Sequence, residues 1–333
     1  METVQRVIVI GSNSFSGAHF VDYCLNLGMN VIGISRSKEP DSVFLPYKWK
    51  VQKDSKFLFF QHDLNTEFEQ IKERIQLFQP DFVVNFAAQG MVAQSWENPE
   101  QWFNTNTLSN VRLHQFLKTC SCLKKYVQIS TPEVYGSCEG SVKENTLYNP
   151  STPYAVSKAA ADMSLMTFYR EYGFPVVFIR SANVYGPGQL LYRIIPRASL
   201  FFLLGKPIEL HGGGTSVRSF IHIRDVCEGI VKVMLEAKPG NIYHLATQES
   251  VSIRSLVEII AQKTDRVFLD YVHEVGERPG KDKAYLLDCT KVKNELGWES
   301  TINLNDGLDQ TIGWIKKYIE IFKNQPFDYH YKP

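Results

Sequence analysis

A tyrosine and a lysine four residues apart are the first pair in this sequence that could carry out acid–base chemistry. Tyr154 and Lys158 lie in a segment with a helical pattern, so their side chains fall on one helix face. A free tyrosine has a pKa of about 10, and it acts as a base near neutral pH only if a neighbouring cation stabilises the phenolate. Lys158 supplies that cation, and the pair predicts a base that acts on a hydroxyl group.

A hydroxyl group at the end of a predicted strand gives this pair its context. Ile129-Ser130-Thr131 lies where the strand ends, one helix upstream of Tyr154. A hydroxyl there is placed to hydrogen-bond the same substrate oxygen as the tyrosine. The spacing of Tyr154 and Lys158 alone is weak evidence for a catalytic pair. The nearby hydroxyl group at the end of the strand strengthens that interpretation.

A glycine turn between the first predicted strand and the first predicted helix is the candidate dinucleotide site. In this position backbone N–H groups can face a pyrophosphate. The alternative is an ordinary strand-to-helix turn. The residues predicted to bind the cofactor here are Gly11, Asn13, Ser14, Phe15, Ser16 and Gly17.

The end of the second strand, Ser35-Arg36-Ser37, has no acidic residue to bind the ribose 2′-hydroxyl of NAD. An arginine between two serines can pair with a 2′-phosphate, so NADP is favoured and NAD is the alternative. The competing interpretation is that Arg36 stacks on adenine or faces solvent. Adenine and ribose contacts, or simple packing, are further expected after the third and fourth strands, at Asp63, Leu64, Ala87 and Ala88.

These residues are positioned by short apolar runs that alternate with longer helical segments, the pattern of a parallel sheet with crossover helices. We therefore predict an α/β, Rossmann-type doubly wound parallel sheet with a smaller, interleaved C-terminal substrate-binding lobe. The predicted strands are Val7–Ile10, Val31–Ile34, Phe57–Phe60, Phe82–Phe86, Tyr126–Ile129 and Val176–Ile179. The predicted helices are Ala18–Leu27, Phe68–Phe78, Asn106–Thr119, Tyr154–Tyr172, Ile195–Leu204, Val226–Glu236, Ile253–Lys263 and Leu308–Phe322.

The domain boundaries follow the change in pattern after Gly186-Pro187-Gly188. Residues 1–185 are predicted to form the dinucleotide-binding domain, and 219–248 to return to it. The lobe is predicted from 186–218 and 249–325, followed by a tail at 326–333.

Composition narrows the possible partners. The 333 residues contain 36 Lys plus Arg and 35 Asp plus Glu, so a formal charge of +1 gives no broad field to recruit nucleic acid or a membrane surface. The apolar runs are far shorter than the ~18 residues of a membrane span, and no signal peptide is apparent, which predicts a cytoplasmic protein. The six cysteines lack paired Cys-x-x-Cys spacing, so we expect reduced thiols and no metal site.

The sequence resembles the extended short-chain dehydrogenase/reductase family, in its NAD-dependent epimerase/dehydratase branch, from the Gly11 turn to about Ser300. Ser130-Thr-Pro-Glu-Val-Tyr-Gly136 is most similar to the sugar nucleotide 4,6-dehydratases, which carry a Thr-x-Glu motif here. Arg278-Pro-Gly-Lys-Asp-Lys-Ala-Tyr-Leu-Leu-Asp288, followed by Leu296-Gly-Trp298, resembles the C-terminal signature of the dTDP-glucose enzymes.

The resemblance implies a hydro-lyase that converts an NDP-hexose to an NDP-4-keto-6-deoxyhexose. C4 is oxidised, water is lost across C5 and C6, and the hydride returns to C6 through NADP or NAD. The implied catalytic residues are Thr131, Glu133, Tyr154 and Lys158. The alternative for Glu133 is a surface carboxylate. The residues expected to contact the nucleotide sugar are Gln89, Ser95, Asn183, Arg193, Arg218 and Arg278.

The sequence also departs from the family pattern. The dTDP-glucose enzymes have an aspartate where this chain has Pro132, which has no ionisable group, so we expect Glu133 both to remove the C5 proton and to protonate the departing C6 oxygen. The GDP-mannose enzymes also lack that aspartate, and the stretch Ala88 to Glu100 resembles theirs, so the nucleotide base stays open.

Several alternatives stay open at this stage. They are a 4-epimerase, an NDP-uronate decarboxylase and a catalytically silent NADP-binding sensor. The resemblance also implies a homodimer with a four-helix contact formed by the helices at 106–119 and 154–172, and packing of those faces within one chain is the alternative.

Overall fold

The computed structural model describes residues 4–50, 56–138, 140–276 and 286–329. Its centre is a seven-stranded sheet in the order β3-β2-β1-β4-β5-β7-β12, with every neighbouring pair parallel. The order reverses beside β1, which is the topological switch point of a doubly wound sheet. The strands are β1 (Arg6–Ile10), β2 (Asn30–Ser35), β3 (Phe57–Gln61), β4 (Phe82–Asn85), β5 (Lys125–Ile129), β7 (Val176–Ser181) and β12 (Ile242–Leu245).

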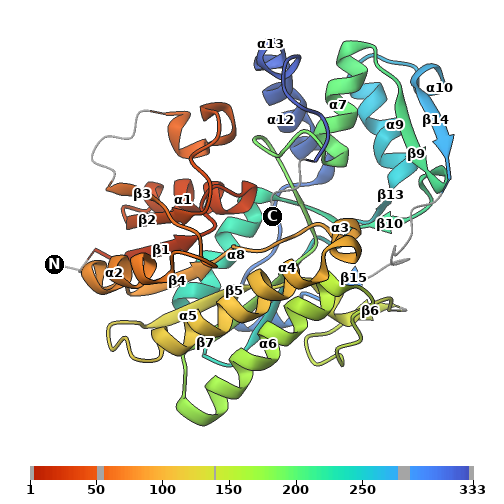
Figure 1. Cartoon of the computed structure of the whole chain (residues 1–333). Coiled ribbons are helices and arrows are strands. Elements are labelled where there is room, and N and C mark those ends of the chain that lie inside the picture. Colours follow the sequence, from red (N-terminus) through yellow and green to blue (C-terminus); the bar gives the residue numbers. More distant parts are fainter. Residues whose placement is uncertain (1–3, 51–55, 139, 277–285, 330–333) are drawn as a thin grey trace.

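Both faces of the sheet are buried, because alternate residues of each strand pack into different clusters. Val7 and Val9 contribute to the cluster that includes α1 and α8, whereas Ile8 and Ile10 contribute to the cluster that includes α2, α5 and α6. This two-sided burial explains why the strands read as continuous apolar runs. The covering helices are α1 (Phe15–Asn26), α2 (Phe68–Phe78), α5 (Ser109–Leu117), α6 (Pro153–Tyr172) and α8 (Ile223–Glu236) (Figure 1).

A smaller lobe, at the upper right of Figure 1, has its own apolar cluster. Its helices are α7 (Ile194–Leu204), α9 (Ile253–Lys263), α10 (Phe268–Tyr271) and α12 (Leu304–Lys317), the last followed by α13 (Ile319–Phe322). Its strand pairs are β9 (Ile208–His211) with β14 (Val272–Val275) and β10 (Val217–Arg218) with β13 (Val251–Ser252).

Short elements connect the sheet and the lobe. Two further parallel pairs join β8 (Asn183–Tyr185) to β11 (Phe220–His222) and β6 (Ser141–Val142) to β15 (Leu286–Leu287). The remaining helices are α3 (Val92–Glu97), α4 (Pro99–Phe103), α11 (Thr290–Leu296) and the single-turn segments η1 (Ser42–Phe44), η2 (Pro46–Lys48), η3 (Asn104–Leu108), η4 (Pro132–Tyr135) and η5 (Gly212–Gly214).

The predicted fold class is confirmed, with three differences in detail. The strand β12 was not predicted, because Tyr243 and His244 interrupt its apolar pattern. The helix expected at 106–119 begins as the π-helical turn η3 and continues as α5. The helix expected at 308–322 is two helices, separated at Tyr318.

Among the described residues, no helix is both long and apolar enough to cross a bilayer. None of the six cysteines, all of which lie in the described residues, forms a disulfide.

Candidate active site

A cleft of about 1300 Å³ lies at the carboxyl ends of the central strands, between the sheet and the lobe. This edge of a doubly wound sheet is where such folds bind ligands. It brings together twelve of the residues predicted from the sequence: Ser14, Phe15, Ser16, Arg36, Ala88, Gln89, Thr131, Glu133, Tyr154, Lys158, Asn183 and Arg193.

Two local structures place the predicted catalytic side chains. Thr131 follows β5 and caps η4, and its hydroxyl oxygen accepts a hydrogen bond of 3.3 Å from the backbone N–H of Glu133. Tyr154 lies in the first turn of α6, which is capped by Thr152 and has Pro153 at its start. The side chains of Thr131 and Tyr154 are hydrogen-bonded to each other. The end of a strand and the start of a helix therefore converge on one pair of hydroxyl groups.

The surroundings of Tyr154 act on its pKa in both directions. Burial of the phenol between the cleft walls and the nearby Glu133 carboxylate raise this pKa. The hydrogen bond with Thr131 and the charge of Arg193 lower it. Because its pKa is raised, Tyr154 is protonated at neutral pH in this structure.

Lys158 is buried, with 3% of its surface exposed, and its ammonium donates a hydrogen bond of 2.8 Å to the carbonyl of Ile129. Burial lowers the Lys158 pKa to about 8, and the carboxylate of Asp162 acts in the opposite direction. The lysine therefore binds the end of β5, and its charge depends on a residue that the sequence analysis did not consider.

The glycine turn is packed against neighbouring backbone. A Cβ atom on Gly11, whose φ is +82°, would lie 2.7 Å from the backbone nitrogen of Ala87. A Cβ atom on Gly17 would lie 2.3 Å from the carbonyl oxygen of Gly11. These contacts require glycine at both positions, and they set the N-terminus of α1 at the cleft.

Asn13 connects the glycine turn to the end of β2. Its backbone N–H donates to the Ser35 hydroxyl at 2.9 Å, and its amide donates to the Ser37 carbonyl at 2.8 Å. Its side-chain oxygen is buried without a hydrogen-bond partner, which is typical of a group that a ligand satisfies. Ser35 and Ser37 thus fix the segment from which Arg36 reaches the cleft. The turn and this segment fit a bound dinucleotide.

The π-helical turn η3 fixes one of the residues that line the cleft. Asn106 accepts from the backbone N–H of Gln89 at 2.8 Å and donates to its carbonyl at 3.0 Å, so it fixes a residue that lines the cleft. π-Helical turns are frequent at functional sites.

Ten of the predicted residues that the structure describes do not line the cleft. Six of them lie in the glycine turn or in the segments packed against it: Gly11, Asn13, Gly17, Ser35, Ser37 and Ala87. The other four make local contacts. Asp63 forms a local turn, accepting from the Asn65 N–H at 2.7 Å, and Leu64 packs in the core. Ser95 is fully buried and donates to the Val92 carbonyl of its own helix at 2.6 Å. Arg218 lies in β10 and donates to the Val217 carbonyl at 2.8 Å. Arg278, which was also predicted to contact the nucleotide sugar, lies outside the described residues.

One part of the cleft wall, near the C-terminus, was not predicted from the sequence. Residues 325 and 326, together with Asp328 and Tyr329, line the cleft there. Arg197 donates to the Asp328 carboxylate at 3.0 Å, and the rings of Tyr192 and Tyr329 lie 5.2 Å apart. The signal in the sequence was the spacing of Arg193 and Arg197, which places two cations on one face at the start of α7.

The doubly wound sheet, the glycine turn and the paired tyrosine and lysine define a dinucleotide-binding enzyme of the extended short-chain dehydrogenase/reductase class. The family model described as GDP-mannose 4,6 dehydratase matches residues 8–311, and the chain belongs to this family. The predicted family of sugar nucleotide 4,6-dehydratases is confirmed.

Individual relatives agree with the family. A dTDP-glucose 4,6-dehydratase of Xanthomonas campestris is 28% identical over 325 residues, which are 92% of this chain and 92% of that protein. The solved dTDP-glucose 4,6-dehydratase of Streptomyces venezuelae, with NAD bound, is 30% identical with a TM-score of 0.87, covering 95% of this chain and 98% of that one.

The same fold also serves a different reaction. A UDP-glucose 4-epimerase of Thermotoga maritima is 26% identical with a TM-score of 0.85, covering 95% of this chain and 100% of that one. The residues in the cleft, rather than the fold, therefore carry the functional argument.

Proposed function

We propose that this protein is a sugar nucleotide 4,6-dehydratase that converts an NDP-hexose to an NDP-4-keto-6-deoxyhexose. The observation that carries the proposal is the position of Glu133, which lines the same cleft as Tyr154 and acts electrostatically on its phenol. A carboxylate at this place can act as the base that removes a proton from C5, in addition to the tyrosine that acts on the 4-hydroxyl. The family and the similar dehydratases support the same reaction.

NADP is the cofactor that we propose. The glycine turn, Asn13 and the start of α1 would hold the pyrophosphate, and Arg36, which lines the cleft at the end of β2, would pair with a 2′-phosphate. Bound there, an oxidised nicotinamide would supply positive charge in the cleft and a reversible acceptor for the hydride that moves from C4 to C6.

Tyr154 takes the proton of the 4-hydroxyl, and Thr131 hydrogen-bonds the same oxygen. Burial and the Glu133 charge raise the Tyr154 pKa, whereas Thr131 and Arg193 lower it. A charged Lys158 and added positive charge would favour the phenolate further. The 4-ketone makes the C5 proton acidic, and Glu133 removes it. Because Pro132 has no ionisable group, Glu133 also gives a proton to the C6 oxygen, which leaves as water. After hydride return to C6, C5 takes up a proton that exchanges with solvent.

The substrate occupies the lobe side of the cleft in this proposal. Asn183 and Arg193 line it, and Arg193 lies close enough to Tyr154 to act on its pKa. A diphosphate bound by Arg193 would place the attached hexose beside Tyr154 and Glu133.

The test is mass spectrometry of the products formed in heavy water from dTDP-glucose, GDP-mannose, CDP-glucose, UDP-glucose and UDP-glucuronate. We expect one substrate to lose one water and gain one deuteron at C5, which also identifies the nucleotide. Isomerisation without loss of water would instead make the protein an epimerase, and loss of carbon dioxide from the uronate would make it a decarboxylase. Cofactor binding without turnover of any substrate would indicate a sensor.

We also propose that the protein is a cytoplasmic homodimer, and cysteines that form no disulfide suit that compartment. The support for the dimer is a group of exposed apolar side chains on adjacent helices, with a second copy as the occupant. They are Phe103 of α4, Leu108 of η3, and Val156 and Met163 of α6. Sedimentation analysis should show a dimer that Met163→Glu converts to a monomer, and a monomeric parent protein would contradict the proposal.

A further inference from the structure

Helix α6 is connected to the end of β5 by three successive contacts. Tyr154 bonds to Thr131, and Lys158 donates to the carbonyl of Ile129 at 2.8 Å. One turn further on, Asp162 accepts a hydrogen bond of 2.6 Å from the hydroxyl of Ser130. Residues spaced by four lie on one helix face, so these contacts form a single row. Asp162 is the third member of this row, and it lies beyond the catalytic pair.

Asp162 is fully buried and forms an ion pair with Arg180 of β7, whose side chain is also fully buried, at 2.8 Å. One oxygen of Asp162 holds both of these contacts, and the other has no hydrogen-bond partner. Buried ion pairs with incomplete hydrogen bonding add little stability compared with apolar residues of similar size. The pair therefore calls for a role other than stability.

Arg180 connects this carboxylate to the turn that carries Glu133. Its guanidinium donates to the hydroxyl of Tyr135 in η4 at 2.5 Å and to the hydroxyl of Tyr148. It also lies 4.7 Å from the centre of each of these two rings. The position of η4, and with it that of Glu133, thus depends on a cation that Asp162 holds.

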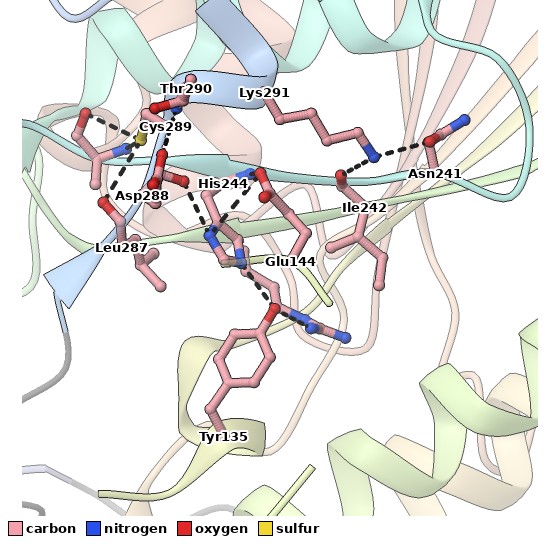
Figure 2. A network of polar contacts seen from close by, with 12 residues as sticks. Tyr135, Glu144, Asn241, Ile242, His244, Leu287, Asp288, Cys289, Thr290 and Lys291 are labelled. Carbon is pink, nitrogen blue, oxygen red and sulfur yellow. Dashed lines mark hydrogen bonds and ion pairs between the residues drawn. The ribbon is translucent and has the colours of Figure 1, made fainter. Parts of the chain in front are cut away.

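The network continues into the C-terminal part of the chain. The Tyr135 hydroxyl is hydrogen-bonded to Nε2 of His244 at 2.8 Å, and Nδ1 of His244 contacts the Asp288 carbonyl at 3.2 Å (Figure 2). Burial and the Arg180 charge lower the pKa of His244 to about 3, so His244 is neutral. His244 therefore adds no positive charge to the network at neutral pH.

The titratable groups that interact electrostatically with Asp162 lie on α6 itself, on two strands of the central sheet, in η4 and in the segment before α6. They are Lys158 and Tyr154 of α6, Tyr126 of β5, Arg180 of β7, Tyr135 of η4 and Tyr148 before α6. Asp162 is the anion that opposes the effect of burial on Lys158.

We propose that Asp162 is a positioning residue that holds α6 in register with the end of β5 and keeps the buried Lys158 ammonium charged. It holds the register through its contacts with Ser130 and Arg180 and acts on Lys158 through its own negative charge, without touching the substrate. The catalytic consequence rests on the proposed function, whereas the effect on the charge of Lys158 does not.

The test compares Asp162→Asn with Ser130→Ala, which removes a hydrogen bond but keeps the carboxylate charge. The first readout is an NMR titration of ¹³Cε-labelled lysine, with the Lys158 signal identified by its loss in Lys158→Arg. We expect Asp162→Asn to move this titration to lower pH by about one unit. Ser130→Ala should leave it unchanged.

The second readout is the pH profile of cofactor reduction in a single turnover with the sugar nucleotide. Because Lys158 must be charged to favour the Tyr154 phenolate, the loss of activity at high pH should begin about one unit lower in Asp162→Asn. A merely structural defect would lower the rate at every pH without moving the profile. If the parent protein reduces no cofactor, the proposed function fails, and the NMR titration still decides the role of Asp162.

Asp162→Asn leaves the Arg180 charge buried without its anion and can prevent folding. The double variant Asp162→Asn with Arg180→Gln removes both charges, and its Lys158 titration should move in the same direction by a smaller amount. An unchanged Lys158 titration in the folded single or double variant would overturn the proposal. An equal shift in Ser130→Ala would overturn it as well.

Discussion

The two ends of the cleft are built in different ways. At the cofactor end, Gly11, Gly17 and Asn13 come from one short segment and are held by close backbone contacts and buried hydrogen bonds. At the lobe end, the wall combines the start of α7, the strand β9 and residues 325–329, which are far apart in the sequence. The ion pair between Arg197 and Asp328 is partly exposed there, with 34% and 82% of the two side chains accessible.

This difference predicts different consequences of substitution. A side chain added at the cofactor end has to displace backbone, so it should change stability and cofactor binding together. A charge removed at the lobe end acts through solvent-exposed groups, so it should change substrate affinity and leave stability nearly unchanged. The following variants are ordered from the largest expected effect to the smallest.

Gly17→Ala tests the cofactor end. Its new Cβ would lie 2.3 Å from the Gly11 carbonyl oxygen, so we expect a loss of about 1–3 kcal/mol in the free energy of unfolding. Dinucleotide affinity should fall with it, because the turn that faces the pyrophosphate has to move. Thermal melting and fluorescence titration with NADP measure both quantities. Gly313→Ala on α12 is the matched control, since a Cβ there meets open space. Equal changes in stability and in NADP affinity for the two variants would contradict the proposed difference between the two ends of the cleft.

Arg193→Gln tests the lobe end. A hydrogen bond from a charged group contributes about 1.5–3 kcal/mol, so KM for the sugar nucleotide should rise about 10- to 100-fold. Melting temperature and cofactor affinity should stay close to those of the parent protein. Arg170→Gln removes an exposed arginine from the far end of α6 and serves as the control. A similar rise in KM for both variants would show that the effect is one of overall charge.

Arg36→Gln sharpens the description of the cofactor end. If Arg36 pairs with a 2′-phosphate, its loss should weaken NADP binding about tenfold and leave NAD binding nearly unchanged. A tenfold loss corresponds to the lower end of the range for a hydrogen bond to a charged group. Equilibrium titrations with the two dinucleotides measure the ratio, with the neighbouring exposed Lys38→Gln as the control. Equal losses for NADP and NAD would contradict the proposed preference.

The same difference explains which features the sequence predicted. The glycine turn, the strand runs and the pair Tyr154 and Lys158 are local patterns, because each depends on residues within a few positions of one another. The lobe end depends on contacts such as that of Arg197 with residue 328, whose separation of 131 residues no local pattern encodes. Residues 326–333 were accordingly expected to be a tail, whereas the structure places Tyr329 on the cleft wall.

Buried polar groups were the second kind of feature that local patterns did not reveal. Arg180 stands in an apolar strand, and Asp162 lies four residues after Lys158 on the same helix face. Both residues could be noticed in the sequence, but only the contact between β7 and α6 shows that they form an ion pair. Ser95, in contrast, was expected to contact the substrate but does not line the cleft. Its hydroxyl donates a hydrogen bond to a carbonyl of its own helix, which the sequence pattern did not reveal.

The central claim is that Glu133 carries the elimination, and Glu133→Gln tests it most directly. Single-turnover absorbance of the reduced nicotinamide, with mass spectrometry of quenched samples, follows oxidation at C4 and loss of water separately. We expect the reduced cofactor to form and persist while loss of water slows by about 10²- to 10⁴-fold. Glu249→Gln, an exposed carboxylate outside this cleft, should behave as the parent protein does. Loss of water from Glu133→Gln at the parent rate would contradict the account.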